Sequence, residues 1–304
     1  MKVLLMLVRR EFWEHRVLWI TPLVLAALLV GAALVFGPNL RMDIQVGRFE
    51  QDLGDPALLF GLATLGLGTP FYIAAAILVV VYLLDCLYTE RRDRSVLFWK
   101  SLPVSDGAVV LSKLLVGMVI VPLGYWLCAA ITTLLVSGVL ALRGGEGLMN
   151  GAVPLWVGAG WLRAQVIILY GTIATVLWYA PYGAYMLFVS AGAKRSVYAW
   201  AIVPPVMVAV IERMLFSTNY IGQFVTRGFS DVLGLAFRVN RQIEAAIGEA
   251  MRAPRGGGPG GRGGFMRRLD PTDLLNSPQL WIGLAAAALL IWLAIVMRRR
   301  GEEG

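Results

Sequence analysis

The sequence predicts an all-α integral membrane protein in which residues 1–304 form a single transmembrane domain with six transmembrane helices. Three observations predict this fold class. Hydrophobic residues make up 58% of the chain and charged residues only 15%. The mean hydropathy is +0.71, and six apolar stretches approach the ~20 residues needed to cross a bilayer. A soluble domain of this length could not bury so much apolar surface, so lipid is the expected solvent.

The formal net charge of +8 arises from basic residues at the ends of the apolar stretches. This placement favours orientation in a bilayer over nucleic-acid binding. The two cysteines, Cys86 and Cys128, lie in or at the edge of apolar stretches. Two such thiols make neither a disulfide framework nor a metal site, so both are interpreted as packing residues.

Residues 1–16 predict an amphipathic helix that lies on the cytoplasmic membrane surface. The aromatic side chains of Phe12 and Trp13 share an apolar region of this helix, and the basic Arg9 and Arg10 lie on other faces. The apolar run near the start is too short for a signal peptide and is followed by charge. A simple extension of the first span remains the alternative.

The first two spans are expected at 17–36 and 70–88. The second begins at 70 because Thr69 can cap a helix and Pro70 suits its first position. A shorter apolar stretch at 57–67 precedes it. That stretch is too short to cross, so it is expected to rest at the outer surface or to re-enter the membrane.

The third and fourth spans are expected at 114–142 and 164–193. Both are longer than a crossing requires, which predicts tilt or a part outside the core. The fifth, 196–216, carries Glu212 and Arg213 near its end. Carboxylates at membrane depth are costly and often functional, so Glu212 is a candidate gating residue unless it simply pairs with its neighbour.

The sixth span is expected at 280–297, after Ser277 and Pro278 and before an arginine triplet at 298–300. Basic residues also occur in the amino-terminal segment, after span two and after span four. Six spans place all four basic groups on one side. By the positive-inside rule this side is the cytoplasm, so both termini are expected to be cytoplasmic, in a membrane of the bacterial inner type.

The segment 217–276 is expected to form an extracytoplasmic loop, although it is basic, because the positive-inside rule weakens for loops of about sixty residues. Within it, 252–264 is rich in glycine and is interpreted as a flexible linker.

No Gly-Lys pair occurs in the chain, which excludes the Walker A motif, and His15 is the only histidine. No catalytic residue, no bound metal and no directly bound cofactor are therefore expected.

A charged, basic loop separates spans two and three. Residues 90–100 within it predict a short helix that Pro103 would stop, and Ser105 or Asp106 can cap the helix that leads into span three. Its charged and aromatic side chains are candidate contacts with a separate soluble protein. These candidates are Glu90, Arg91, Arg92, Asp93, Arg94, Phe98, Trp99 and Lys100. Alternatively, the charges hold the topology and Trp99 anchors at the headgroups.

Several stretches carry a family resemblance. These are RREFWEHRVLWITPLVLAALL near the start, the charged ERRDRS after span two, and LFWKSLPVSDGAVVLSKLL before span three. The chain resembles the permease subunit of an ABC-2 type transporter with six spans and no fused ATPase. The resemblance implies an exporter in which two permeases pair, as a homodimer or heterodimer. Each would bind a separate ABC ATPase subunit, which holds ATP and Mg. It also implies that 90–100 is the coupling helix, seated in a groove of the ATPase.

Other functions remain open. A stand-alone secondary transporter is disfavoured because no chain of intramembrane charges and no internal repeat is visible. An intramembrane enzyme is disfavoured by the single histidine and the absence of a positioned carboxylate pair. A membrane protein without transport activity is the remaining alternative. Aromatic and small residues in 161–192 would suit lipids, drugs or peptides equally, so the sequence does not identify a cargo.

Overall fold

A computed structural model describes residues 2–36, 56–93, 105–143, 159–193, 196–216 and 274–300. These residues are almost entirely helical, and none of them forms a strand. Five of the described helices are long and apolar enough to cross a membrane, or six if one bent pair counts as a single span. For the described residues, the prediction of an all-α protein with several helices long and apolar enough to cross a membrane is confirmed.

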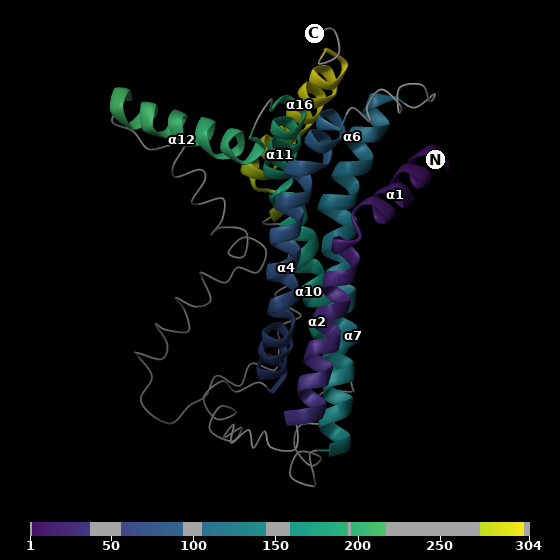
Figure 1. The fold of residues 1–304 in the computed structure, drawn as a ribbon. Helices are drawn as coiled ribbons and strands as arrows, with labels where there is room; N and C mark the ends of the chain where they lie inside the picture. Colours follow the sequence, from purple (N-terminus) through teal and green to yellow (C-terminus); the bar gives the residue numbers. More distant parts are fainter. Residues whose placement is uncertain are drawn as a thin grey trace, which may run out of the picture.

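The chain begins with α1 (Lys2–Glu14) and α2 (Val17–Phe36), which are joined by a tight turn. The bounds of α2 agree with the expected first span. Across the turn, the rings of Phe12 and Trp19 stack with centroids 3.8 Å apart and an interplanar angle of 3°. This contact fixes the direction in which α1 leaves the bundle beside α2 (Figure 1).

The second span, α4 (Pro56–Arg92), is one continuous helix of 37 residues. The expected break before 70 is therefore wrong, and the stretch at 57–67 is the first part of this helix. Pro70 lies inside α4, and the hydroxyl of Thr69 donates to the Leu65 carbonyl at 2.8 Å rather than capping a helix start. Proline is tolerated within membrane helices because neighbouring groups satisfy the backbone that it frees.

The third span combines α6 (Asp106–Leu115), a π-helical turn η2 (Val116–Ile120) and α7 (Val121–Arg143). Ser105 caps α6, as expected: its side chain accepts a hydrogen bond of 3.3 Å from the Ala108 N–H. The helical span starts at Asp106, before the expected limit at 114. Lys113 therefore lies on the helix and not in the loop.

The fourth span is broken. It consists of α10 (Ala159–Trp178) and α11 (Ala180–Gly192), bent by 49° at Tyr179. The expected fourth span at 164–193 therefore consists of two helices with a bend between them. Pro181 lies in the first turn of α11 and has no N–H to donate to a carbonyl of the preceding turn, which accounts for the break.

Two helices complete the described part, α12 (Val197–Phe216) and α16 (Pro278–Arg300). Figure 1 shows α16 beside α11, whereas α12 runs outward, across the direction of α2, α4 and α7. Most of α12 is exposed and apolar, including Ile202 and Met207. The layout with six transmembrane helices therefore stays a prediction. The segments 37–55, 94–104 and 217–273, with the glycine-rich 252–264, lie outside the described residues.

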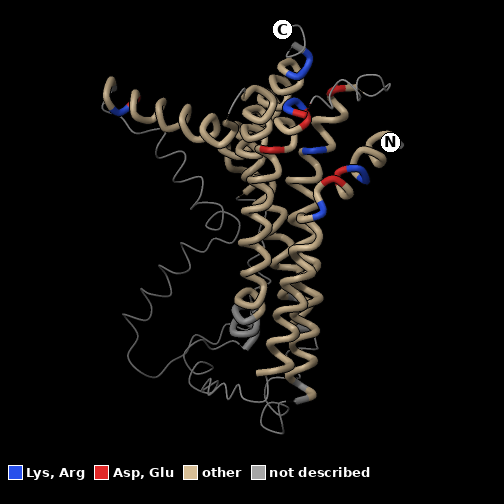
Figure 2. Tube along the Cα trace, in the orientation of Figure 1, with Lys and Arg blue, Asp and Glu red and all other residues tan. Residues whose placement is uncertain are grey.

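The main core lies where α2, α4, η2, α7 and α11 meet, and Phe71, Leu83, Tyr125 and Leu187 are fully buried there. Charged residues are distributed differently. In Figure 2 the described Lys, Arg, Asp and Glu gather at the end of the bundle that holds α1 and the carboxyl end of α16, apart from a charge near the tip of α12. Charged residues are absent from α2, from residues 56–84 of α4 and from residues 121–142 of α7, as a lipid-facing region requires.

Candidate functional site

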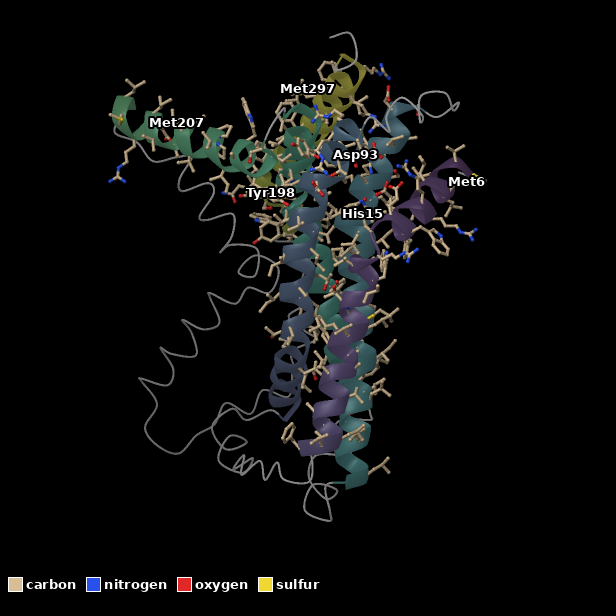
Figure 3. All side chains as sticks on the ribbon, viewed as in Figure 1. Met6, His15, Asp93, Tyr198, Met207 and Met297 are labelled. Carbon is tan, nitrogen blue, oxygen red and sulfur yellow. The ribbon has the colours of Figure 1, made fainter. Side chains whose placement is uncertain are left out.

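A cluster of ionic side chains is buried at the charged end of the bundle, and we call it the polar junction. Figure 3 shows oxygen and nitrogen atoms gathered near the labelled His15 and Asp93. The buried members come from four helices that are far apart in sequence. They are Glu11 of α1, Glu90 of α4, Lys113 of α6 and Arg298 of α16, and each side chain is 7% exposed or less.

Lys113 stands at the centre of the polar junction. Its ammonium nitrogen lies 2.8 Å from Oε1 of Glu11 and 3.1 Å from Oε1 of Glu90. An ammonium group has three N–H donors, and two of them can be directed at these carboxylates. The start of span three is therefore bound to both α1 and the end of α4.

Glu90 forms ion pairs with cationic side chains from three helices. Besides Lys113, its Oε1 accepts from Nη2 of Arg10 at 3.1 Å and its Oε2 accepts from Nη1 of Arg298 at 3.0 Å. Arg10 also binds Glu14 through Nε at 2.6 Å. A single carboxylate thus holds α1, α6 and α16 against the carboxyl end of α4.

Arg298 extends the polar junction to the first residue of α6. Its Nε lies 3.3 Å from Oδ1 of Asp106, while its Nη1 binds Glu90. The end of α16 therefore bridges the end of α4 and the start of α6. These two helix ends are also the two ends of the connection at 94–104.

The carboxylate of Glu11 is satisfied at both oxygens, since Oε2 accepts from the Tyr82 hydroxyl at 2.8 Å. His15 packs edge-on against Tyr82, and its Nε2 lies 3.7 Å from Glu11. Burial lowers the pKa of His15 below its usual 6.5, although the Glu11 carboxylate acts in the opposite direction. His15 is therefore neutral near pH 7.

The ligand atoms of Glu11, Glu14 and His15 lie within 4.8 Å of one another, close enough to hold a metal ion. Both carboxylates, however, are already bound by cations: Lys113 holds Glu11 and Arg10 holds Glu14. These contacts neutralise the charge that would attract a metal, so the geometry favours an ion-pair network over a metal site.

The charges of the polar junction balance. Three carboxylates, Glu11, Glu90 and Asp106, face three cations, Arg10, Lys113 and Arg298. Buried charges are stable only when paired and hydrogen-bonded. The six groups therefore join the ends of α1, α4, α6 and α16 through ion pairs.

A second contact secures the broken span. Nη2 of Arg91 donates to the carbonyls of Ser190 and Ala193, at 2.6 and 3.0 Å, which satisfies acceptors at the end of α11. The buried Ser190 hydroxyl oxygen in turn lies 3.1 Å from the amide nitrogens of Leu87 and Tyr88. The end of α11 is therefore held against the end of α4.

The expected docking residues fall into three groups. Glu90 and Arg91 use their side chains for the internal contacts above, so these two do not face outward. Arg92 and Asp93 are 66% and 55% exposed at the end of α4. The remaining four, Arg94, Phe98, Trp99 and Lys100, lie outside the described residues.

The expected interfacial residues of α1 also divide. Arg9 and Trp13 are exposed, Phe12 stacks on Trp19, and Arg10 turns inward to the polar junction. Glu212 lies on α12, the helix that leaves the bundle, and the structure does not bring it to the polar junction (Figure 1).

Sequence reasoning missed Glu11, Tyr82 and Lys113 as site residues. One feature of the sequence could have identified Lys113. It is a basic residue in an apolar stretch, after the helix cap at Ser105 and directly before Leu114. A charge in that setting needs a buried partner.

Comparison with known protein families, with curated proteins and with solved structures finds no match to this chain.

Proposed function

We propose that this chain is the membrane subunit of an ATP-driven exporter of the ABC-2 kind, in which a separate ATPase subunit hydrolyses ATP. The family resemblance supports this function. The observation that carries it is that the polar junction holds together the two helix ends, Glu90 of α4 and Asp106 of α6, between which the candidate docking segment runs.

The physical argument concerns how force enters the bundle. A partner that pushes on segment 94–104 acts on the chain between α4 and α6. Because Arg298 binds both Glu90 and Asp106, and Lys113 of α6 also binds Glu90, this force moves the two helix ends together instead of bending the loop alone. Arg10 passes the displacement on to α1.

The exposed side chains beside this segment suit a protein partner. Arg92 and Asp93 present opposite charges at the end of α4, and arginine and aromatic residues are prominent in interface energetics. Further partner contacts are assigned to Arg94, Phe98, Trp99 and Lys100. The proposal includes a second permease subunit, cytoplasmic termini in an inner membrane, and ATP with Mg held only by the ATPase.

The test is co-purification of the full-length chain in mild detergent with the ABC ATPase encoded beside it, followed by measurement of ATPase activity. Arg92→Glu and Arg94→Glu are expected to weaken the complex and to abolish its coupled ATPase activity. Arg9→Glu, an equal charge reversal at an exposed arginine of α1, serves as the matched control and is expected to retain both.

If the docking variants bind and couple like the control, the docking surface is misassigned. If the intact, folded chain binds no ATPase, the transporter-subunit proposal fails, and flux through the chain alone in liposomes tests the secondary-transporter alternative.

A further inference from the structure

Two helix irregularities from different spans touch each other. The π-helical turn η2 interrupts span three, and the break at Tyr179 interrupts span four. Met118 of η2 packs on Gly183, which lies one turn after the break. A Cβ atom at Gly183 would lie 2.5 Å from the Met118 sulfur, so a side chain at this position would force Met118 to move.

The same turn also contacts α4 closely. A Cβ atom at Gly117 would lie 2.7 Å from Cδ2 of Leu83 and 3.2 Å from Cδ1 of Tyr82. The absence of a side chain at Gly117 lets α4 approach η2 directly. Tyr82 is the residue whose hydroxyl binds Glu11, so this contact reaches the polar junction.

Both irregularities weaken helical hydrogen bonding locally. A π turn replaces the regular i→i−4 bonds, and such turns occur often at functional sites. Pro181 removes a backbone donor in span four. Sharp bends in helices are found mainly at prolines and at π turns, so bending costs less here than in the regular helix on either side.

We propose that Gly117, Met118 and Gly183 form a hinge, about which the end of the bundle carrying the polar junction swings relative to the other end. Its use in transport rests on the proposed function, because a partner ATPase would drive it. The hinge itself is a property of this chain and is testable without any partner.

The test measures distances between spin labels on the full-length chain in lipid nanodiscs, in a Cys86→Ala, Cys128→Ala background. Labels at the exposed Leu111 and Leu135 flank η2 and lie about 36 Å apart along a regular helix. The control pair, Leu127 and Leu142, lies wholly within α7 at about 22 Å.

The hinge predicts a broad or two-component distance distribution for the pair that flanks η2 and a single narrow one for the control pair. Equally narrow distributions for both pairs would overturn the hinge. A broad distribution for the control pair as well would also overturn it, since bending would then not be confined to η2.

Glycine substitutions test the contact itself. Gly183→Ala places a Cβ against Met118 and is expected to collapse the distribution to one narrow population. Gly138→Ala is the matched control, because a Cβ at that position meets nothing within 4 Å, and it is expected to change nothing. If Gly183→Ala leaves the distance distribution of the pair that flanks η2 unchanged, Met118 and Gly183 are not part of the hinge.

Adding the partner ATPase and ATP separates the two proposals. A shift between the two populations supports both. A two-component distribution that ATP and the ATPase leave unchanged rejects coupling through this site, while the hinge stands on the measurements made without them.

Discussion

The hydroxyl of Tyr82 donates a 2.8 Å hydrogen bond to Glu11, which joins α4 to the inner face of α1. The other carboxylate oxygen of Glu11 is held by Lys113 at 2.8 Å. Together with the Arg10–Glu90 ion pair and the stacking of Phe12 on Trp19, these two contacts attach α1 to the bundle.

Replacing Lys113 with methionine keeps much of the side-chain volume and removes the charge. Two carboxylates, Glu11 and Glu90, then lose their shared cation while remaining buried. Breaking a buried ion pair from one side costs about 3–5 kcal/mol. Lys113→Met is therefore expected to lower the midpoint of thermal unfolding in detergent.

The control for that experiment is Arg92→Met, which removes an equal charge at a side chain that is 66% exposed. It is expected to change stability by no more than about 0.5 kcal/mol. Adding Glu11→Gln to Lys113→Met should recover part of the loss. Equal unfolding midpoints for the Lys113 and Arg92 variants would show that the polar junction contributes no stability.

Arg91→Gln tests the contact between α4 and α11. The substitution removes two hydrogen bonds to the carbonyls of Ser190 and Ala193. Hydrogen bonds that involve a charged group contribute about 1.5–3 kcal/mol, so a loss in this range is expected. Thermal unfolding measures it, and Arg92→Gln at the adjacent exposed position is the comparison. Indistinguishable variants would contradict the assigned role of Arg91.

The attachment of α1 is expected to depend on pH through His15. Burial keeps its pKa below 6.5 while α1 is packed, and the pKa returns toward 6.5 when α1 detaches. The detached state then binds more protons, so acid favours it. Packing of α1 should weaken as pH falls below about 6.5, until the lowered pKa of the packed state is reached.

Limited proteolysis of α1 between pH 7.5 and 5.5 measures this effect, with cleavage expected to quicken toward acid. The other ionisable groups near His15 are Glu11, Lys113, Glu14 and Asp85. His15→Gln should remove the acid dependence in this window. If cleavage of that variant still quickens with acid, one of the neighbouring groups is responsible.

The cap at Ser105 is expected to stabilise the start of span three. Ser105→Ala removes the acceptor for the Ala108 N–H and should cost about 1 kcal/mol. Ser105→Asp supplies an equivalent acceptor and should retain stability. Chemical unfolding of the two variants decides the point: a loss in the aspartate variant equal to that in the alanine variant would exclude capping as the cause.

The described structure agrees with the predictions from the sequence where neighbouring residues alone determine a helix boundary. The bounds of α2 follow from an uncharged apolar run between Arg16 and Gly37, and Ser105 caps α6 as its position predicts. Local rules failed at Pro70, because a proline suited to a helix start is also tolerated within a membrane helix.

The polar junction could not be predicted from the sequence because its members lie far apart in the chain. Glu90 and Arg298 are separated by 208 positions, and each has an ordinary local explanation, as a loop charge or as a topology signal. Only the packing of α1, α4, α6 and α16 gives these charges their partners. The bend at Tyr179 was missed because the apolar run continues through it.

The ion pair between Glu90 and Arg298 can form only late in the synthesis of the chain. While the ribosome is adding the middle of the chain, Glu90 already exists but Arg298 does not, so one oxygen of the carboxylate lacks its final partner. The network closes only after the last described helix has been made. A chain cut short before α16 would lack this ion pair, and a buried carboxylate that loses a cation is destabilising.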